Sequence, residues 1–216
     1  MITVNQVSKR YSGGFVALSQ VNFSLQKGEM VFLTGHSGAG KSTLLKLIAM
    51  LDTPSSGHIV VDGVMLSQLK KRDVSHYRSQ LGITFQSPHL LNDRTVFDNV
   101  ALPLQIQGAP PQLIKKRVHA ALDLVGLLNK GKMRPLCLSG GEQQRVGIAR
   151  AIVHKPKILL ADEPTGNLDP TLASGVMTLF AQLNEAGVSV LVATHHLALI
   201  ASMRHRIVML KGGLIC

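Results

Sequence analysis

The chain has 216 residues, of which 45% are hydrophobic; this composition excludes a disordered chain and is enough for one large α/β domain, or a core with a small subdomain. The formal net charge of +11 favours an anionic partner, such as a nucleotide, a nucleic acid or an anionic membrane surface. No apolar run approaches the roughly 18 residues of a membrane helix, and two cysteines do not make a disulfide framework.

The N-terminal sequence MITVNQVSKRY lacks the basic and then apolar pattern of a secretion signal, so the protein is expected to remain in the cytosol. Aromatic residues are scarce, with six Phe, two Tyr and no Trp. Because proteins that bind single-stranded nucleic acid stack the bases on aromatic rings, this scarcity weakens such a function. No nucleic acid partner is expected.

Strands and turns are predicted for the first 65 residues. Alternating apolar residues indicate strands at 2–7 and 21–25, and a short apolar run indicates a buried strand at 30–34. A helix is predicted at 43–50. Residues 58–66 form a predicted hairpin around Asp62-Gly63, a pair typical of tight turns.

Helical patterns dominate from residue 87 to residue 155. We expect Pro103, Gly108, the prolines at 110–111 and Gly126 to interrupt them, and the apolar spacing at 112–127 predicts an amphipathic helix. Cys137 is expected to be a small buried residue rather than a nucleophile.

The α/β pattern returns after residue 156. Strands are predicted at 157–164 and 188–195, a helix at 174–187 and a closing hairpin at 205–215. The chain is therefore predicted to be a single domain, 1–216. In it, segments 1–86 and 156–216 form an α/β core with a β subdomain, and 87–155 forms a helical subdomain.

Residues 35–43, GHSGAGKST, match the phosphate-loop pattern G-x-x-x-x-G-K-[ST] between a predicted strand and a predicted helix. The glycines permit a tight loop whose N–H groups point inward, the lysine reaches the β- and γ-phosphates, and the first hydroxyl binds Mg²⁺. The predicted nucleotide-binding residues are Gly35, His36, Ser37, Gly38, Ala39, Gly40, Lys41, Ser42 and Thr43.

Two acids end the predicted strand 157–164. Asp162 is placed to hold Mg²⁺ through water, and Glu163 suits a general base that polarises the attacking water. The alternative is that Asp162 and Glu163 are simply solvated acids at a strand end, and the phosphate loop upstream argues against it.

Three further residues give weaker signals. His195 ends the next buried strand and could bond a γ-phosphate or the attacking water, although many such histidines are structural. Gln86, at the end of LGITFQ, could sense Mg²⁺ or the nucleophile. Tyr11 could stack on adenine or belong to the core.

A second anion site is predicted at LSGGEQ, where Ser139 can cap a helix and Glu142 can complete a capping box. Gly140 and Gly141 allow close approach to the backbone, and helix N-termini attract anions.

In this order, Tyr11, the phosphate loop, Gln86, LSGGEQQ, LLADEPTGNLD and His195 resemble the ATP-binding subunits of ABC transporters over essentially the whole chain. The resemblance implies an ATPase that pairs head to tail, with each ATP held by one subunit's phosphate loop and by Ser139, Gly140 and Gly141 of the other. Residues 167–169, Asn-Leu-Asp, would cross that interface. It also implies catalytic roles for Lys41, Glu163 and His195, and Mg²⁺ ligation by Ser42, Gln86 and Asp162.

The stretch HLLNDRTVFDNVALPL, with Asp93-Arg94-Thr95-Val96, is similar to the bacterial cell-division branch of this family. That similarity implies a homodimer on ATP binding, an integral membrane partner, possible contacts with other division proteins and a peripheral position on the cytoplasmic face of the inner membrane. ATP use would be coupled to peptidoglycan hydrolase activation. The alternatives are an ATPase for lipoprotein release or macrolide export, a non-transport ATPase acting on nucleic acid or ribosomes, and a non-hydrolysing scaffold.

The sequence departs from the family pattern after two of these residues. His196 stands where the family usually has Asp, and Ser87-Pro88 follows Gln86 where an acid is usual. The segment 87–91, which includes Leu90 and Leu91, is predicted to receive a helix of the membrane partner.

Overall fold

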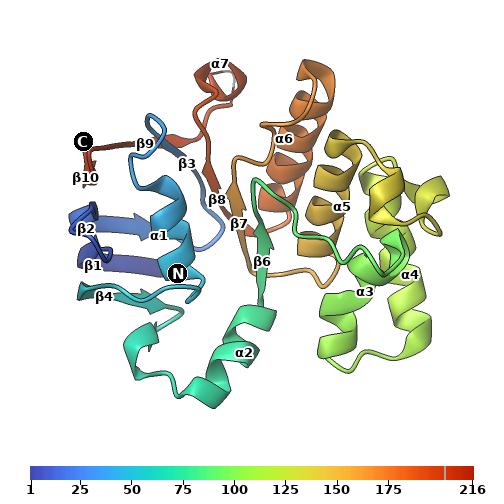
Figure 1. Cartoon of the computed structure of the whole chain (residues 1–216), viewed down its shortest axis with the longest axis horizontal. Helices are drawn as coiled ribbons and strands as arrows, with labels where there is room; N and C mark the ends of the chain where they lie inside the picture. Colours follow the sequence, from blue (N-terminus) through green and yellow to red (C-terminus); the bar gives the residue numbers. More distant parts are fainter. Residues whose placement is uncertain (202) are drawn as a thin grey trace.

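Two β-sheets and a group of helices beside the larger sheet form the part of the chain that the computed structural model describes, residues 1–201 and 203–216 (Figure 1). The four-stranded sheet has the order β2-β1-β4-β5, and the six-stranded sheet has the order β10-β9-β3-β8-β7-β6. The strands are β1 (Ile2–Arg10), β2 (Val16–Leu25), β3 (Met30–Thr34), β4 (Ser56–Val61), β5 (Val64–Met65), β6 (Leu81–Thr84), β7 (Ile158–Asp162), β8 (Ser189–Ala193), β9 (Arg206–Lys211) and β10 (Leu214–Ile215). The helices are α1 (Lys41–Ile48), α2 (Lys71–Ser79), α3 (Val96–Ile106), α4 (Pro111–Leu124), α5 (Gly140–Ile152), α6 (Pro170–Glu185) and α7 (Leu197–Ile200).

The six-stranded sheet is parallel except for β10, which pairs antiparallel with β9. All residues of β3, β7 and β8 are buried, as expected for strands covered on both faces. Their carboxyl ends meet at one edge of the sheet, which is where open α/β sheets bind ligands.

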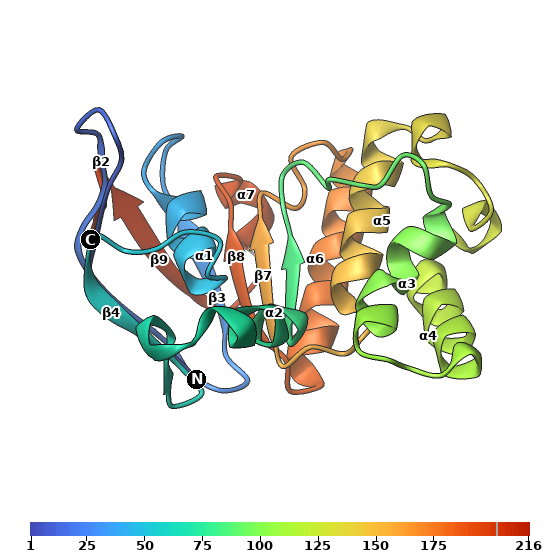
Figure 2. The same ribbon diagram turned by 60° about the horizontal axis from the view of Figure 1, so that its bottom comes forward.

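Each face of this sheet packs into a separate hydrophobic cluster, because successive strand residues point to opposite faces. On β3, Val31 and Leu33 join the cluster of α1 and the four-stranded sheet, whereas Met30 and Phe32 join the cluster of α3 to α6. Both views place α1 on one side of β7 and the pair α5 and α6 on the other (Figures 1 and 2).

The four-stranded sheet is antiparallel and contains the predicted hairpin. Val61 pairs with Val64, and the two residues between them, Asp62 and Gly63, have φ values of 49° and 78°. Two consecutive left-handed residues make the turn that best suits a two-residue hairpin, which is why the sequence signal was reliable here.

Helices α3, α4 and α5 pack against one another, and α5 also packs against β6. Both α3 and α5 begin with a capping box, Thr95 with Asp98 and Ser139 with Glu142. Within residues 1–201 and 203–216, no helix combines the length and apolar character needed to cross a membrane.

The structure confirms the α/β class and the antiparallel sheet, and it corrects several local expectations. Pro103 lies inside α3 instead of interrupting it, and Cys137 is exposed because the short 3-10 turn that it ends buries Pro135. Helix α6 begins at Pro170, four residues before the predicted 174, because the Asp169 carboxylate accepts hydrogen bonds from the N–H groups of Thr171 and Leu172.

The sequence analysis did not predict α2, β6 or α7. Helix α2 has no buried residue and therefore no apolar stripe that a sequence pattern could reveal. The division at residues 86 and 155 stays a prediction.

Candidate functional site

The predicted phosphate loop joins β3 directly to α1, and its glycines are required by close packing. Gly35 and Gly40 have φ values of 146° and 106°. A Cβ on Gly35 would lie 2.1 Å from the carbonyl oxygen of Leu210, and a Cβ on Gly40 would lie 2.4 Å from that of Ala17. Helix α1 has no acidic residue in its first turn, so its N–H groups can attract an anion.

Lys41 is buried at the start of α1, and its ammonium group is held inside the loop. Its Nζ donates hydrogen bonds to the carbonyl oxygens of Gly35 at 2.8 Å and His36 at 3.2 Å. The same Nζ lies 3.7 Å from Glu163 Oε1. The lysine charge therefore sits between the loop and the acids that end β7.

Ser42 and Asp162 form a pair of oxygen donors beside the loop. Ser42 Oγ donates a hydrogen bond of 2.9 Å to Asp162 Oδ1. Burial raises the pKa of the Asp162 carboxyl and nearby Glu163 adds to the effect, whereas the Ser42 hydrogen bond and Lys41 oppose it. A bound cation would favour the ionised form of Asp162, and a hydroxyl with a carboxylate is the hard donor set that Mg²⁺ prefers.

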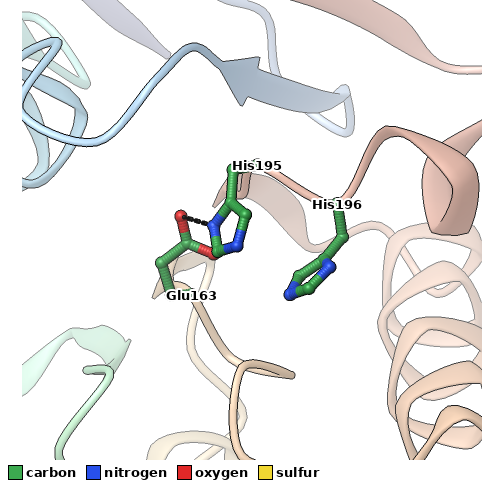
Figure 3. A group of neighbouring side chains, drawn as sticks. All are labelled: Glu163, His195 and His196. Atoms are coloured by element: carbon green, nitrogen blue, oxygen red, sulfur yellow. Dashed lines mark hydrogen bonds and ion pairs between the residues drawn. The ribbon is translucent and has the colours of Figure 1, made fainter.

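Glu163 follows β7 in a conformation that is uncommon for glutamate, with φ of 47°. Its N–H donates to the carbonyl oxygen of Ala193 at 2.9 Å, which fixes the residue against β8. Oε1 accepts a hydrogen bond of 2.8 Å from His195 Nδ1, and the buried Oε2 has no hydrogen-bond partner in the described part of the chain (Figure 3). Because residues held in such conformations cluster at functional sites, this geometry favours a catalytic role.

These groups surround one cavity of about 410 Å³. The loop and the start of α1 line the cavity, together with Gln86, Glu163 and His195, which lie at the ends of three separate strands. Tyr11, Gly35 and Asp162 do not line it, although Asp162 reaches it through Ser42. The lining residues are Phe15, Ala17, His36, Ser37, Gly38, Ala39, Gly40, Lys41, Ser42, Thr43, Gln86, Glu163 and His195.

Phe15 is a site residue that the sequence analysis missed. Its side chain lines the cavity and is 59% exposed, whereas Tyr11 stacks behind it with ring centroids 6.5 Å apart and planes 14° apart. Lys9 Nζ also lies over the Tyr11 ring, 4.9 Å from its centroid. The Tyr11 ring therefore contacts both Phe15 and Lys9. The only signal for Phe15 was an aromatic residue after two glycines, which is too common to single out.

We expect Phe15→Ala to weaken ATP binding more than Tyr11→Ala does, since the exposed ring is the one available to a base. Loss of one base–aromatic stack, about 1–3 kcal/mol, predicts a Kd increase of about 5- to 150-fold. Calorimetric titration with ATP measures this effect. Inorganic tripolyphosphate is the control, because it has no base and should bind both variants as it binds the wild type. A larger loss of ATP affinity in Tyr11→Ala than in Phe15→Ala would show that Tyr11 is the residue that stacks on the base.

The second predicted anion site lies at the start of α5, away from this cavity. Ser139 Oγ accepts a hydrogen bond from the Glu142 N–H at 3.3 Å, and Glu142 Oε2 accepts one from the Ser139 N–H at 3.0 Å, as a capping box requires. Hydrogen bonding to Lys130 lowers the pKa of Glu142, with the Ser139 N–H adding to the effect. None of residues 139–141 lines the cavity, and α5 is separated from α1 by the β6 and β7 strands (Figure 1).

The start of α5 instead contacts the segment after β7. A Cβ on Gly141 would lie 3.2 Å from Leu168 Cδ2 and 3.4 Å from the carbonyl oxygen of Asn167. Gln144, buried on α5, donates a hydrogen bond of 3.0 Å to the carbonyl oxygen of Phe85, next to Gln86. Gln144 is thus a positioning residue that the sequence analysis missed, and the second Gln of EQQ was its only signal.

Comparisons with known proteins agree on one family. The family model described as ABC transporter matches residues 18–166. The "Cell division ATP-binding protein FtsE" of Escherichia coli K12 is 57% identical over 213 residues, covering 99% of this chain and 96% of that protein. The protein of the same name from Bacillus subtilis is 42% identical, covering 100% of this chain and 94% of that protein.

Solved structures give the same result. The dimeric structure of MJ0796, a bacterial ABC transporter cassette, superposes with a TM-score of 0.94 at 36% identity, covering 100% of this chain and 96% of that one. A second structure of that cassette, in a post-hydrolysis state bound to ADP and Pi, matches with the same TM-score. The structure thus matches the fold predicted from the sequence over the full length of the chain.

Proposed function

Because the chain belongs to the ABC transporter family and is one of its ATPases, we propose that it is the Mg²⁺-dependent ATP-hydrolysing subunit of a bacterial cell-division complex. One observation supports the chemistry above all: Lys41, Ser42, Glu163 and His195 converge on one cavity at the carboxyl edge of the parallel sheet. The names of the curated relatives support the role in division.

The roles follow from the contacts. Lys41 and the loop N–H groups bind the β- and γ-phosphates. Ser42, Asp162 and Gln86 would hold Mg²⁺, which when bound neutralises phosphate charge. Glu163 polarises the attacking water. Its Oε2, which has no hydrogen-bond partner among the described residues, is the oxygen that would accept a proton from that water. His195, held by Glu163 Oε1, orients the water and the γ-phosphate.

In a homodimer, residues 139–141 of one subunit would complete the ATP site of the other. Residues 139–141 begin a helix that attracts anions but do not line the cavity in their own subunit. Placed against the cavity of a second subunit, they would complete its ATP site. Their contact with Leu168 and Asn167 would link that site to the segment predicted to cross the interface. The dimeric state of the MJ0796 cassette supports this arrangement.

The proposed membrane partner is an integral protein resembling FtsX, which would hold this chain at the cytoplasmic face of the inner membrane, near other division proteins. Leu90 is partly buried against the hydrophobic cluster, so it is not a free docking residue. A neighbouring groove of about 420 Å³ is lined by residues of α2, β6, α3 and α5 that include Ile83, Leu102, Ile106 and Arg150. We assign it to an amphipathic helix of the partner that carries acidic residues, because Arg78 and Arg150 border the apolar surface.

Arg150 connects this groove to the ATP site. Its guanidinium donates hydrogen bonds to the carbonyl oxygens of Pro88 and His89, just after Gln86. A helix in the groove would therefore contact the residue that holds the segment next to Gln86. Nucleotide-driven movement of Gln86 would reach the partner by this route.

We expect Ile106→Glu to release the protein from membranes that contain its partner, because Ile106 is 72% exposed and lies in the apolar part of the groove. Flotation of vesicles with the co-expressed partner measures the bound fraction. Ile207→Glu is the matched control, since Ile207 is 48% exposed on β9, away from the groove. Retention of Ile106→Glu on membranes at the wild-type level, with ATP binding intact, would remove the groove as the docking site.

A further inference from the structure

Three potential metal ligands lie together at the ends of β7 and β8: Glu163, His195 and His196 (Figure 3). One donor atom from each lies within 4.8 Å of the other two. The two imidazole rings face one another, with centroids 4.2 Å apart and planes tilted by 34°. We propose that this cluster is an inhibitory binding site for a divalent transition metal ion of the Zn²⁺ class.

The chemistry of the donors selects the ion. Two imidazoles and one carboxylate are the ligands that Zn²⁺ uses in three-residue sites, in which a water molecule completes the tetrahedron. Imidazole suits Zn²⁺, Ni²⁺ and Cu²⁺, whereas Mg²⁺ requires oxygen ligands in octahedral geometry. The cluster is thus chemically distinct from the pair of Ser42 and Asp162.

Glu163 provides an independent indication of a ligand. The residue is 8% exposed, and its Oε2 is a buried acceptor that has no partner in the described chain. Figure 3 shows the Glu163 carboxylate beside the His195 ring, with His196 on the far side of that ring in this view. A buried carboxylate oxygen without a partner is costly, and a cation at this point would satisfy it.

The spacing is close to what an ion needs. With metal–ligand bonds of about 2.0–2.1 Å, donor atoms around a tetrahedral ion lie roughly 3.4 Å apart. His196 is exposed and can rotate to close the remaining gap. If the ion takes His195 Nδ1, it replaces the hydrogen bond of that nitrogen to Glu163, and the displaced proton passes to solvent.

Such an ion would bind to Glu163, the proposed general base. With Glu163 and His195 ligating, neither could act on the attacking water, while Lys41 and the loop would still bind ATP. The inhibitory effect rests on the proposed roles of these two residues, but the binding of the ion does not. His196 makes the third ligand in this chain.

The test measures metal binding without nucleotide. Zn²⁺ is titrated into the untagged protein in competition with a chromophoric chelator, and Co²⁺ is added separately to record the visible absorption of a tetrahedral site. We expect one Zn²⁺ per chain, no displacement by millimolar Mg²⁺, and at least a tenfold weaker affinity in His196→Asn and in Glu163→Gln. His119→Asn, which removes an exposed histidine on α4, should bind as the wild type does.

Several results would overturn the site. They are the absence of a one-to-one complex, an unchanged affinity in His196→Asn, an unchanged affinity in Glu163→Gln, or displacement by Mg²⁺. ATP hydrolysis at buffered free Zn²⁺ is measured separately for the wild type and His196→Asn, and each is compared with its own rate in chelator. Inhibition should be weaker in His196→Asn. Because the binding assay contains no ATP, a failed metal site leaves the ATPase proposal standing, and an inactive enzyme leaves the metal site standing.

Discussion

Glu163→Gln is expected to bind ATP at the wild-type affinity and to lose nearly all turnover. The amide keeps the size of the side chain, but it cannot take a proton from water. Removal of a general base typically costs 10²–10⁴-fold in rate, so steady-state phosphate release should fall by about that factor. Lys41 and the loop remain, so fluorescence titration with an ATP analogue should give an unchanged Kd. ATP that cannot be hydrolysed should also hold the proposed dimer together, which size-exclusion chromatography with ATP would detect.

Glu185→Gln is the matched control, because Glu185 is an exposed acid at the end of α6. It should hydrolyse ATP as the wild type does. A Glu163→Gln variant that turns over at the wild-type rate would show that another group polarises the water. A variant that no longer binds ATP would indicate that Glu163 maintains the loop through Lys41, to which its Oε1 lies within 3.7 Å.

The second large effect concerns sites shared between subunits. Lys41→Ala removes the ammonium proposed to bind phosphate, and Ser139→Arg places bulk and charge at the start of α5, so neither variant alone would have an intact copy of the proposed shared site. A mixed dimer has one site with both Lys41 and Ser139 intact. We therefore expect the mixture to regain part of the ATP-dependent dimer that both pure variants lack, as measured by analytical ultracentrifugation.

Ser67→Arg is the control for the added arginine, since Ser67 is exposed in the 3-10 turn at Leu66–Gln68. It should dimerise normally. Loss of the Ser139 cap costs about 1 kcal/mol, so thermal melting should show the Ser139→Arg variant folded. If crosslinking detects mixed dimers but the mixture dimerises no better with ATP than either variant alone, residues 139–141 do not serve the neighbouring subunit.

Local chemistry determined the parts of the site that sequence analysis could predict. The phosphate loop, the cap at Ser139 and the Asp62-Gly63 turn each depend on residues within a few positions of one another, so their spacing alone carries the information. Buried strands β3, β7 and β8 were predictable because each contains a run of four apolar residues. Polar residues at the ends of parallel strands meet at one edge, which is why Asp162, Glu163 and His195 could be assigned to the site from sequence.

The remaining features depend on contacts between distant segments. Phe15 lines the cavity because β2 brings its preceding turn beside the loop, and Gln144 reaches the Phe85 carbonyl only because α5 packs against β6. The left-handed conformation of Glu163 has no local sequence signal, and neither does the lack of a hydrogen-bond partner for its Oε2 among the described residues, since both arise where β7 meets β8. The sequence by itself determined which chemical groups the protein has and on which elements they lie. Only the tertiary structure decided which of these groups meet, because side-chain contacts across a sheet depend on strand order and helix packing rather than on separation along the chain.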